Sequence, residues 1–195
     1  MRAPACGQGW PVIAKAGEGG NTARGLRAER TAGMSELAEM IARVAQPGRV
    51  DWIGLRGERR GEVEVVPSVL CGEDGLVGDH GRAGKRAVTL IQAEHLGAIG
   101  AYLGRGAIAP DVLRRNLVVS GINLASLKGR QVQVGDALLE LTVICAPCSR
   151  MEEALGHGGY AAVRGHGGWC AKVVRAGRIQ VGDVVQVADE GAQSG

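Results

Sequence analysis

The chain has 195 residues, of which 45% are hydrophobic, and it contains no phenylalanine, three tryptophans and two tyrosines. It is therefore long enough for one domain, and the core of that domain must consist mainly of aliphatic side chains. The formal net charge is +3, and residues 1–33 account for all of it with five basic and two acidic side chains, so the rest of the chain has no basic excess of the kind that binds nucleic acid.

The cysteine pattern indicates a reducing compartment. The chain has five cysteines, an odd number at sparse spacing, which is not typical of a secreted disulfide framework. We see no signal peptide, and no apolar run reaches the ~18 residues that a membrane span needs. We therefore expect a reduced, cytoplasmic protein that binds neither a membrane nor nucleic acid. The cysteines are Cys6, Cys71, Cys145, Cys148 and Cys170.

The first predicted element is a helix that follows a segment of biased composition. Residues 1–33 are rich in glycine, alanine and arginine without a persistent apolar period, and we predict that they form a disordered extension. A helical pattern capped by Ser35 covers 34–46. We expect one folded domain over 34–189 and a flexible tail over 190–195. The apolar face of the helix consists of Leu37, Ile41 and Val44.

From Gly48 onward the pattern changes to short strands between glycine-rich turns. One helix is expected at 93–103, a short helical turn at 111–114 and a short helix at 150–155, whereas the glycine-rich stretch 156–168 is expected to be a loop. Many short strands, regular turns and few helices predict a mainly β fold, built as a closed or nearly closed barrel. The expected strands are 50–55, 62–66, 87–91, 117–119, 131–134, 137–145, 169–175 and 178–187.

Two segments of the chain resemble each other. Residues 129–136 and 177–183 both read as a turn, a strand and a Gly-Asp turn before another strand. We interpret them as two hairpins with the same turn requirement, in preference to a duplicated unit.

The strongest candidate for chemistry is the segment TVICAPCSRM at 142–151. A strand ends there and Pro147 stops it. The helix that follows places Cys148 near a helix N-terminus, where backbone N–H groups and the helix dipole favour a thiolate. Arg150 adds positive charge. A thiolate attacks sulfur, carries a persulfide or binds a soft metal.

Three other interpretations of the thiols stay open. The spacing Cys145-x-x-Cys148 also occurs in dithiol redox pairs. A zinc site is a second possibility, with the ligands Cys145, Cys148, His166 and Cys170. Buried thiols also behave as small hydrophobic groups, and we expect this of Cys145 inside a strand and of Cys71 in a loop.

Two basic clusters suit an anionic ligand. Arg114, Arg115 and Asn116 precede an apolar strand, and guanidinium and amide groups bind phosphate well; a solvated charge pair is the alternative. Lys85 and Arg86 follow a glycine-rich turn, and we expect them to face an anion at the mouth of the barrel.

Several segments, taken in order, resemble one known family. They are GLVGDH, GKRAVTLIQAEHL, LRRNLVVSGINL, GRQVQVGDALLELT, CAPCSRMEEALG, RGHGGWCAKVV and GRIQVGDVV. Over about residues 50–187 the chain resembles the MOSC domain, the C-terminal domain of molybdenum cofactor sulfurases, in its stand-alone bacterial form. The resemblance implies a β-barrel of the pyruvate-kinase-barrel type with a few short helices.

The resemblance also implies a site. Stand-alone relatives and the mitochondrial amidoxime-reducing proteins bind molybdenum cofactor (molybdopterin), and the second cysteine of a similar C-x-x-C segment ligates the molybdenum. This implies that Cys148 is the catalytic residue and the molybdenum ligand. An Arg-x-Asn pair of the same proteins implies that Arg114 and Asn116 contact the cofactor. The other residues that we expect to bind the cofactor are Lys85, Arg86 and Arg150.

Three functions follow as hypotheses. The first is an oxidoreductase that reduces small N-hydroxylated compounds and receives electrons from a separate electron-transfer protein. The second is a sulfur carrier or sulfurtransferase, in which a cysteine desulfurase loads Cys148 with a persulfide for metal-sulfur cofactor assembly. The third is a non-catalytic module that binds a small anion or a partner protein.

Overall fold

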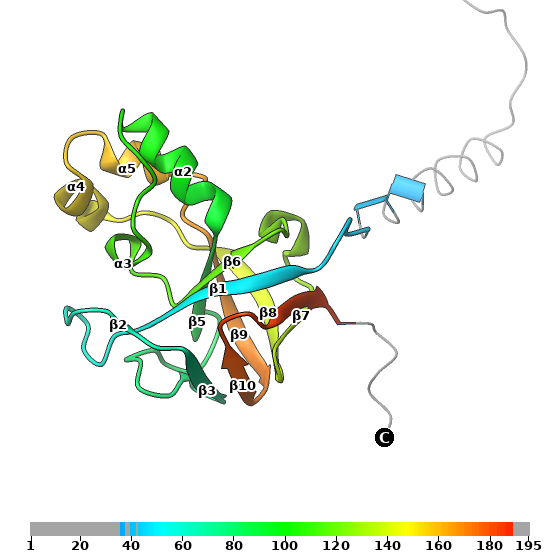
Figure 1. Ribbon diagram of the computed structural model, residues 1–195. Helices are drawn as coiled ribbons and strands as arrows, with labels where there is room; N and C mark the ends of the chain where they lie inside the picture. The colour runs from blue at the N-terminus through cyan, green and yellow to red at the C-terminus, as the bar shows by residue number, and fades with distance from the viewer. Residues whose placement is uncertain (1–35, 38–39, 42, 189–195) are drawn as a thin grey trace, which may run out of the picture. The chain divides into compact units, whose positions relative to one another are not determined.

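Figure 1 presents a computed structural model of the chain, which describes residues 36–37, 40–41 and 43–188. The chain divides into two units, Met1–Met40 and Ile41–Gly195. Only three residues of the first unit are described, so the fold below is that of the second unit.

The predicted N-terminal helix is present at the positions that the structure describes. Residues 36–37 and 40–41 are helical, but the chain has left the helix by Arg43. Val44 therefore does not extend the helical face, and it packs instead against the main hydrophobic core. Four predictions lie outside the described residues: the cap Ser35, the extension 1–33, the tail 190–195 and the domain limits at 34 and 189.

Seven strands of the described part close into a barrel. Each pairs with the next in the order β1, β11, β7, β8, β9, β5 and β6, and β6 returns to β1. Neighbouring strands run antiparallel except β5 and β6, which are parallel and are joined through helices. The strands are β1 (Gly48–Leu55), β5 (Val88–Gln92), β6 (Leu117–Ser120), β7 (Gln131–Val134), β8 (Ala137–Ile144), β9 (Trp169–Arg175) and β11 (Val184–Val187).

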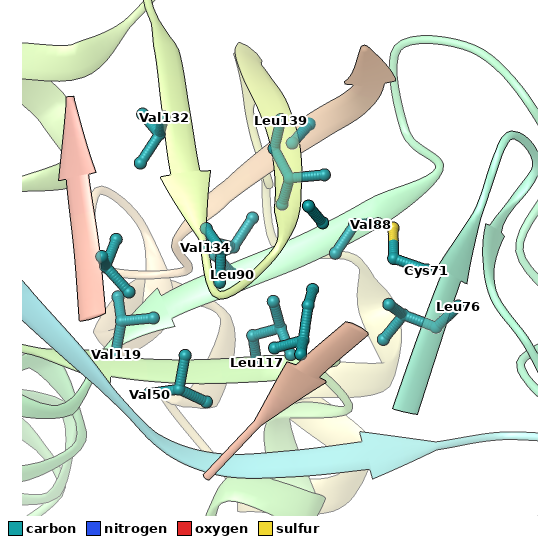
Figure 2. Packing of buried hydrophobic residues seen from close by; sticks show 14 of the residues in the cluster. Val50, Cys71, Leu76, Val88, Leu90, Leu117, Val119, Val132, Val134 and Leu139 are labelled. Atoms are coloured by element: carbon teal, nitrogen blue, oxygen red, sulfur yellow. The ribbon is translucent and has the colours of Figure 1, made fainter. Parts of the chain in front are cut away.

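Aliphatic side chains fill the barrel, as the composition requires. Successive residues of a strand point to opposite faces, so Leu117 and Val119 of β6 point inward and Val118 points outward. In β5, Leu90 likewise lies inside and Ile91 outside. Figure 2 shows side chains from several strands converging on this interior. The mainly β barrel predicted from the sequence is confirmed.

Short helices cover the outward face of β5 and β6, and Figure 1 shows them gathered on one side of the barrel. Ile91 and Val118 belong to the same buried cluster as Ile99 of α2 and Met151 of α4. Because both faces of these strands are buried, their sequences are almost entirely apolar. No helix in the described part is long and apolar enough to cross a membrane. The α-helices are α2 (Ala93–Tyr102), α3 (Pro110–Leu113), α4 (Ser149–Leu155) and α5 (Gly159–Val163), and η1 (Leu124–Leu127) is a 3-10 helix.

Some elements differ from the prediction. A separate sheet contains β3 (Ser68–Gly72) between β10 (Gly177–Gln180) and β4 (Gly75–Leu76), and the short strand β2 (Glu64–Val65) pairs with the end of β1. Cys71 therefore lies in a strand and not in a loop, and its side chain is fully buried. The glycine-rich stretch predicted as a loop contains helix α5.

The second predicted hairpin is wrong. β10 pairs with β3, whereas β11 pairs with β7 and β1, so the two strands belong to different sheets. The carboxylate of Asp183 accepts the N–H of Gln180 at 2.7 Å and fixes the tight turn that redirects the chain. The first hairpin, β7 and β8, is confirmed. Its Asp136 N–H donates to the carbonyl of Arg178 at 2.9 Å, so the two Gly-Asp turns lie side by side.

Candidate functional site

Five neighbouring strands of the barrel share one row of residues in register. Their pairing in the sheet brings residues together that are far apart in the sequence. Arg56 follows β1 and Asn116 precedes β6, and because these strands are antiparallel the two residues lie at the same end of the barrel, which we call the rim. Cys145 follows β8, which runs opposite to β1, so it lies on the other side of this row. The residues in register across β8, β9, β5, β6 and β1 are Ile144, Trp169, Leu90, Leu117 and Ile53.

A buried ion pair organises the rim. The guanidinium of Arg56 donates from Nε to Oδ1 of Asp79 and from Nη2 to Oδ2, both at 3.1 Å. The side chain of Asp79 is 1% exposed and that of Arg56 is 13% exposed. Bidentate contact between two such buried charges fixes both side chains. Sequence reasoning assigned neither Arg56 nor Asp79 to the site, because neither has a local pattern that indicates its partner.

Arg56 also holds the segment that contains the predicted cofactor-binding residues. Its Nη1 donates to the carbonyl of Arg114 at 2.7 Å, and its Nη2 donates to Oδ1 of Asn116 at 3.2 Å. Arg114 has a φ of 56°, the left-handed region that side chains other than glycine rarely adopt. The contact from Arg56 therefore stabilises a backbone conformation that is costly by itself.

Asn116 is buried, and its side chain is engaged with the protein. Its Oδ1 accepts the hydroxyl of Thr89 at 2.8 Å and the N–H of Thr89 at 3.1 Å, and its Nδ2 donates to the carbonyl of Gly54 at 3.2 Å. The amide thus ties β5 to β1 and orients Arg56. Direct contact between Asn116 and a cofactor stays a prediction.

Arg114 and Arg150 converge near the start of α4. Nη2 of Arg114 and Nη1 of Arg150 donate to the same carbonyl, that of Arg59, at 3.3 and 3.4 Å. Burial first, and then the positive charges of Arg150 and Arg56, lower the pKa of Arg114. Guanidinium groups that meet in this way create a local positive potential, which an anion can relieve.

Cys148 lies beside this cationic group. It is the N-cap residue of α4, as the sequence predicted, and its side chain is exposed. Its carbonyl accepts the N–H of Met151 at 2.9 Å, which starts the helix. Arg150 follows two residues later, so the thiol and a guanidinium share the first turn. The thiol is therefore reachable from solvent, and Arg150 lies in the same helical turn.

We expected Cys145 to be a packing residue inside a strand, and the structure differs from this expectation. It follows β8 and its N–H donates to the carbonyl of Gly168 at 2.8 Å. Its thiol is hydrogen-bonded to that of Cys170, and this contact is the main cause that lowers the pKa of Cys145 to about 6. Burial opposes the shift, and the positive charges of Arg115 and Arg86 favour it. Hydrogen bonding to Cys145 and burial together raise the pKa of Cys170, which therefore keeps its proton.

The remaining basic residues divide between these two groups. Arg115 is buried, and its guanidinium donates to the carbonyls of Gly167 at 2.6 Å and Leu113 at 2.8 Å. Lys85 and Arg86 are exposed before β5. The hydroxyl of Thr142 donates to the carbonyl of Lys85 and places this segment next to β8. Arg86 therefore belongs with the two thiols and not with the arginines at α4.

Two other features bear on ligands. Among the described residues there is no group of three or more His, Cys, Asp or Glu side chains that could hold a metal ion, so the zinc interpretation has no support there. A cavity of about 600 Å³ lies between α2 and α5; it includes His166 of the zinc interpretation but none of the residues predicted to bind the molybdenum cofactor. It is lined by Tyr102, Leu103, His157, Gly158, Ala161, Ala162, Arg164 and His166.

The structural class of this protein is a closed barrel that short helices cover on one side, with a thiol and arginine side chains at the rim. The sequence model of the MOSC domain matches residues 75–186, and the chain belongs to the MOSC domain family. The resemblance seen in the sequence is thereby confirmed.

Solved structures agree on the fold. The chain is similar to the YuaD protein from Bacillus subtilis, with a TM-score of 0.65 and 19% identity over 73% of this chain and 96% of that one. It is similar to YiiM from Geobacillus stearothermophilus, with a TM-score of 0.60 and 18% identity over 75% and 78% of the two chains. For YiiM from Escherichia coli the TM-score is 0.58 and the identity 19% over 73% and 70%. No curated protein matches the sequence.

Proposed function

We propose that this MOSC protein binds molybdenum cofactor at the rim of its barrel and reduces small N-hydroxylated compounds. One observation carries the proposal: Arg114 and Arg150 meet at the carbonyl of Arg59, and the exposed Cys148 precedes Arg150 by two residues at the start of α4. A molybdopterin brings two sulfur ligands and a phosphate of its own. The protein then has to supply one more soft ligand and cationic groups, and both are present here.

Each residue has a defined role in this proposal. The thiolate of Cys148 ligates molybdenum, and Arg114 and Arg150 bind the phosphate. Arg56 positions Arg114 through its backbone, and Asn116 positions Arg56. When bound, the cofactor supplies the two-electron oxygen-atom transfer that the reduction of an N–O bond requires. A separate electron-transfer protein supplies the electrons. Lys85 and Arg86 extend the positive charge toward the thiols of Cys145 and Cys170.

Metal content tests the proposal directly. The chain is produced in a host that makes molybdenum cofactor, and molybdenum per chain is measured for the wild type, Cys148→Ser, Arg114→Gln and Arg150→Gln. We expect the wild type to retain molybdenum and Cys148→Ser to lose it. Each arginine variant should bind about ten- to a hundredfold less cofactor, because a charge-assisted hydrogen bond contributes about 1.5–3 kcal/mol.

The matched control is Arg178→Gln, which removes an exposed guanidinium on β10, away from α4 in the fold. It should leave the molybdenum content unchanged. Wild-type protein without molybdenum would rule out cofactor binding. Equal losses in Arg178→Gln and Arg114→Gln would show that general charge, and not this site, matters.

The exposure of Cys148 also favours the sulfur-carrier alternative, because a large donor protein can reach an exposed thiol at the start of a helix. In this case a cysteine desulfurase with cysteine adds one sulfur to the peptide that contains Cys148, as seen by mass spectrometry. Cys148→Ser abolishes the adduct. If Cys148→Ser changes neither metal content nor sulfur loading, the non-catalytic binding module is the remaining function.

A further inference from the structure

We propose that Cys145 and Cys170 form an oxidisable dithiol, a modification site at which peroxides convert the two thiols into a reversible disulfide. This inference does not depend on the proposed function, because neither cysteine has a role in that function. It also differs from the redox pair that the C-x-x-C spacing indicates. The C-x-x-C spacing pairs Cys145 with Cys148, whereas the pairing of β8 with β9 places Cys145 next to the segment that contains Cys170.

Strand pairing brings the two thiols together. Ile144 of β8 is in register with Trp169 of β9, and the next residue, Cys145, bonds to the carbonyl of Gly168. Gly168 is thus the residue opposite Cys145. Cys170 lies two positions further along the chain, and alternate residues of a strand point to the same face, so Cys145 and Cys170 point to the same face of the sheet. The register of β8 against β9 shifts between Leu141 and Ile144. Such a bulge increases the local twist and moves diagonal neighbours closer.

The surroundings of the two thiols differ, and the difference suits a two-step oxidation. Cys145 is half-buried, so a small peroxide can reach it, whereas Cys170 is 1% exposed and is reached only through Cys145. The hydrogen bond from Cys170 and the nearby Arg115 and Arg86 lower the pKa of Cys145. Cys145 is thus the attacking thiolate, and Cys170 is the resolving thiol that still carries a proton.

The reaction balances with a peroxide as the only oxidant. The thiolate of Cys145 attacks one peroxide oxygen, the O–O bond breaks and hydroxide leaves. The attacked oxygen carries its own hydrogen, so a sulfenic acid forms directly, and the departing hydroxide takes up a proton from solvent; sulfur is oxidised and peroxide is reduced. The sulfur of Cys170 then attacks the sulfur of Cys145. An S–S bond forms, the S–O bond breaks, and the proton of Cys170 leaves with the hydroxide as water. Exchange with a dithiol reductant restores both thiols.

Arg115 has a part in this site that the cofactor proposal does not use. Its guanidinium is buried, bonds to Gly167 next to the loop residue Gly168, and contributes positive charge at Cys145. A buried positive charge that is already held by two carbonyls does not have to reorganise when the thiolate forms. It stabilises the thiolate that reacts with the peroxide.

Peptide mapping tests the inference. The full chain is reduced, desalted, treated with a small excess of hydrogen peroxide, alkylated and digested. We expect a cross-linked peptide pair joining the segments of Cys145 and Cys170, with a mass lower by a pair of hydrogens, that dithiothreitol separates again. The same cross-link should form in Cys148→Ser. A disulfide from Cys145 to Cys148, or no disulfide while Cys148 alone is oxidised, would overturn the proposal.

Two variants test the order of the steps. In Cys170→Ala, the resolving thiol is absent, so Cys145 should accumulate as a sulfenic acid that dimedone labels several-fold more than in the wild type. In Cys145→Ser, Cys170 should stay reduced under the same peroxide dose. Oxidation of Cys170 at the wild-type rate in Cys145→Ser contradicts the assignment. The wild-type peptide map decides the proposal by itself if either variant fails to fold.

Discussion

The interior of the barrel and its rim have opposite physical characters. Apolar side chains, contributed by alternate positions of the strands, fill the interior. At the rim, charged side chains are fixed by specific partners, such as Arg56 by Asp79 and by the carbonyl of Arg114. Apolar burial has no direction and tolerates many neighbours, whereas a buried charge requires one partner in one geometry. The free energy of folding is therefore spread over many apolar contacts in the interior, whereas at the rim it depends on a few specific polar contacts.

The largest expected effect concerns the buried ion pair. Asp79→Asn leaves the guanidinium of Arg56 buried without its counter-charge, and we expect a loss of about 3–5 kcal/mol in the free energy of unfolding, measured with urea. The matched control is Asp51→Asn, because Asp51 pairs with Arg49 at 3.0 Å where the Arg49 side chain is 66% exposed. It should cost less than about 1 kcal/mol. Equal losses in the two variants would contradict the comparison.

The next effect concerns the barrel interior. Leu139 is 0% exposed, so Leu139→Ala removes packed methyl groups and leaves a cavity. We expect a loss of about 2–5 kcal/mol in urea unfolding, with an unchanged denaturant slope. Leu70 on β3 is 58% exposed, and Leu70→Ala should change stability by only about 0.5 kcal/mol. A similar cost at both leucines would show that the interior is not packed as described.

A smaller effect concerns the backbone at the rim. Arg114 is the one non-glycine residue with positive φ among the described residues, and Arg114→Ala and Arg114→Gly both remove its guanidinium. The glycine variant should be more stable by about 1–2 kcal/mol, because only alanine keeps the steric cost of the left-handed conformation. At Arg178 in β10, Arg178→Ala should be more stable than Arg178→Gly, because glycine weakens a strand. Thermal or urea unfolding of the four variants measures both differences.

The smallest expected effect is a shift in reactivity with pH. The pKa of Cys145 is lowered to about 6, so its alkylation rate should rise as pH increases through that value and level off above it. Cys170→Ala removes the first cause of the shift, and the midpoint should move upward by roughly one pH unit, the equivalent of one hydrogen bond. Alkylation rates followed by peptide mass spectrometry give both midpoints. An unchanged midpoint would mean that the thiol of Cys170 does not stabilise the thiolate.

The sequence predicted the fold better than the rim, for a physical reason. Strands such as β5 and β6 are identified by runs of apolar and β-branched residues, a signal within a few positions. The error at 178–187 concerned pairing: the Gly-Asp turn was predicted, but the strands on its two sides pair with distant partners, β10 with β3 and β11 with β7 and β1.

At the site, local signals were sufficient only for some residues. Cys148 and Arg150 were found because a helix start and two functional side chains lie within three positions. Arg56 was not found, because its partners are 23 to 60 residues away in the sequence. The proximity of Cys145 to Cys170 gave no local signal for the same reason, and the redox alternative therefore considered only the nearer Cys148.

Closure of the barrel has a consequence for how the chain folds. β1 and β11 are hydrogen-bonded neighbours, Gly48 opposite Val185, although almost the whole domain separates them in sequence. Contacts between such distant segments slow folding, because a long loop must be ordered before they form. During synthesis β1 therefore waits with an unpaired edge until the last strand has left the ribosome, and this interval is when the nascent protein is most exposed to aggregation and to chaperones.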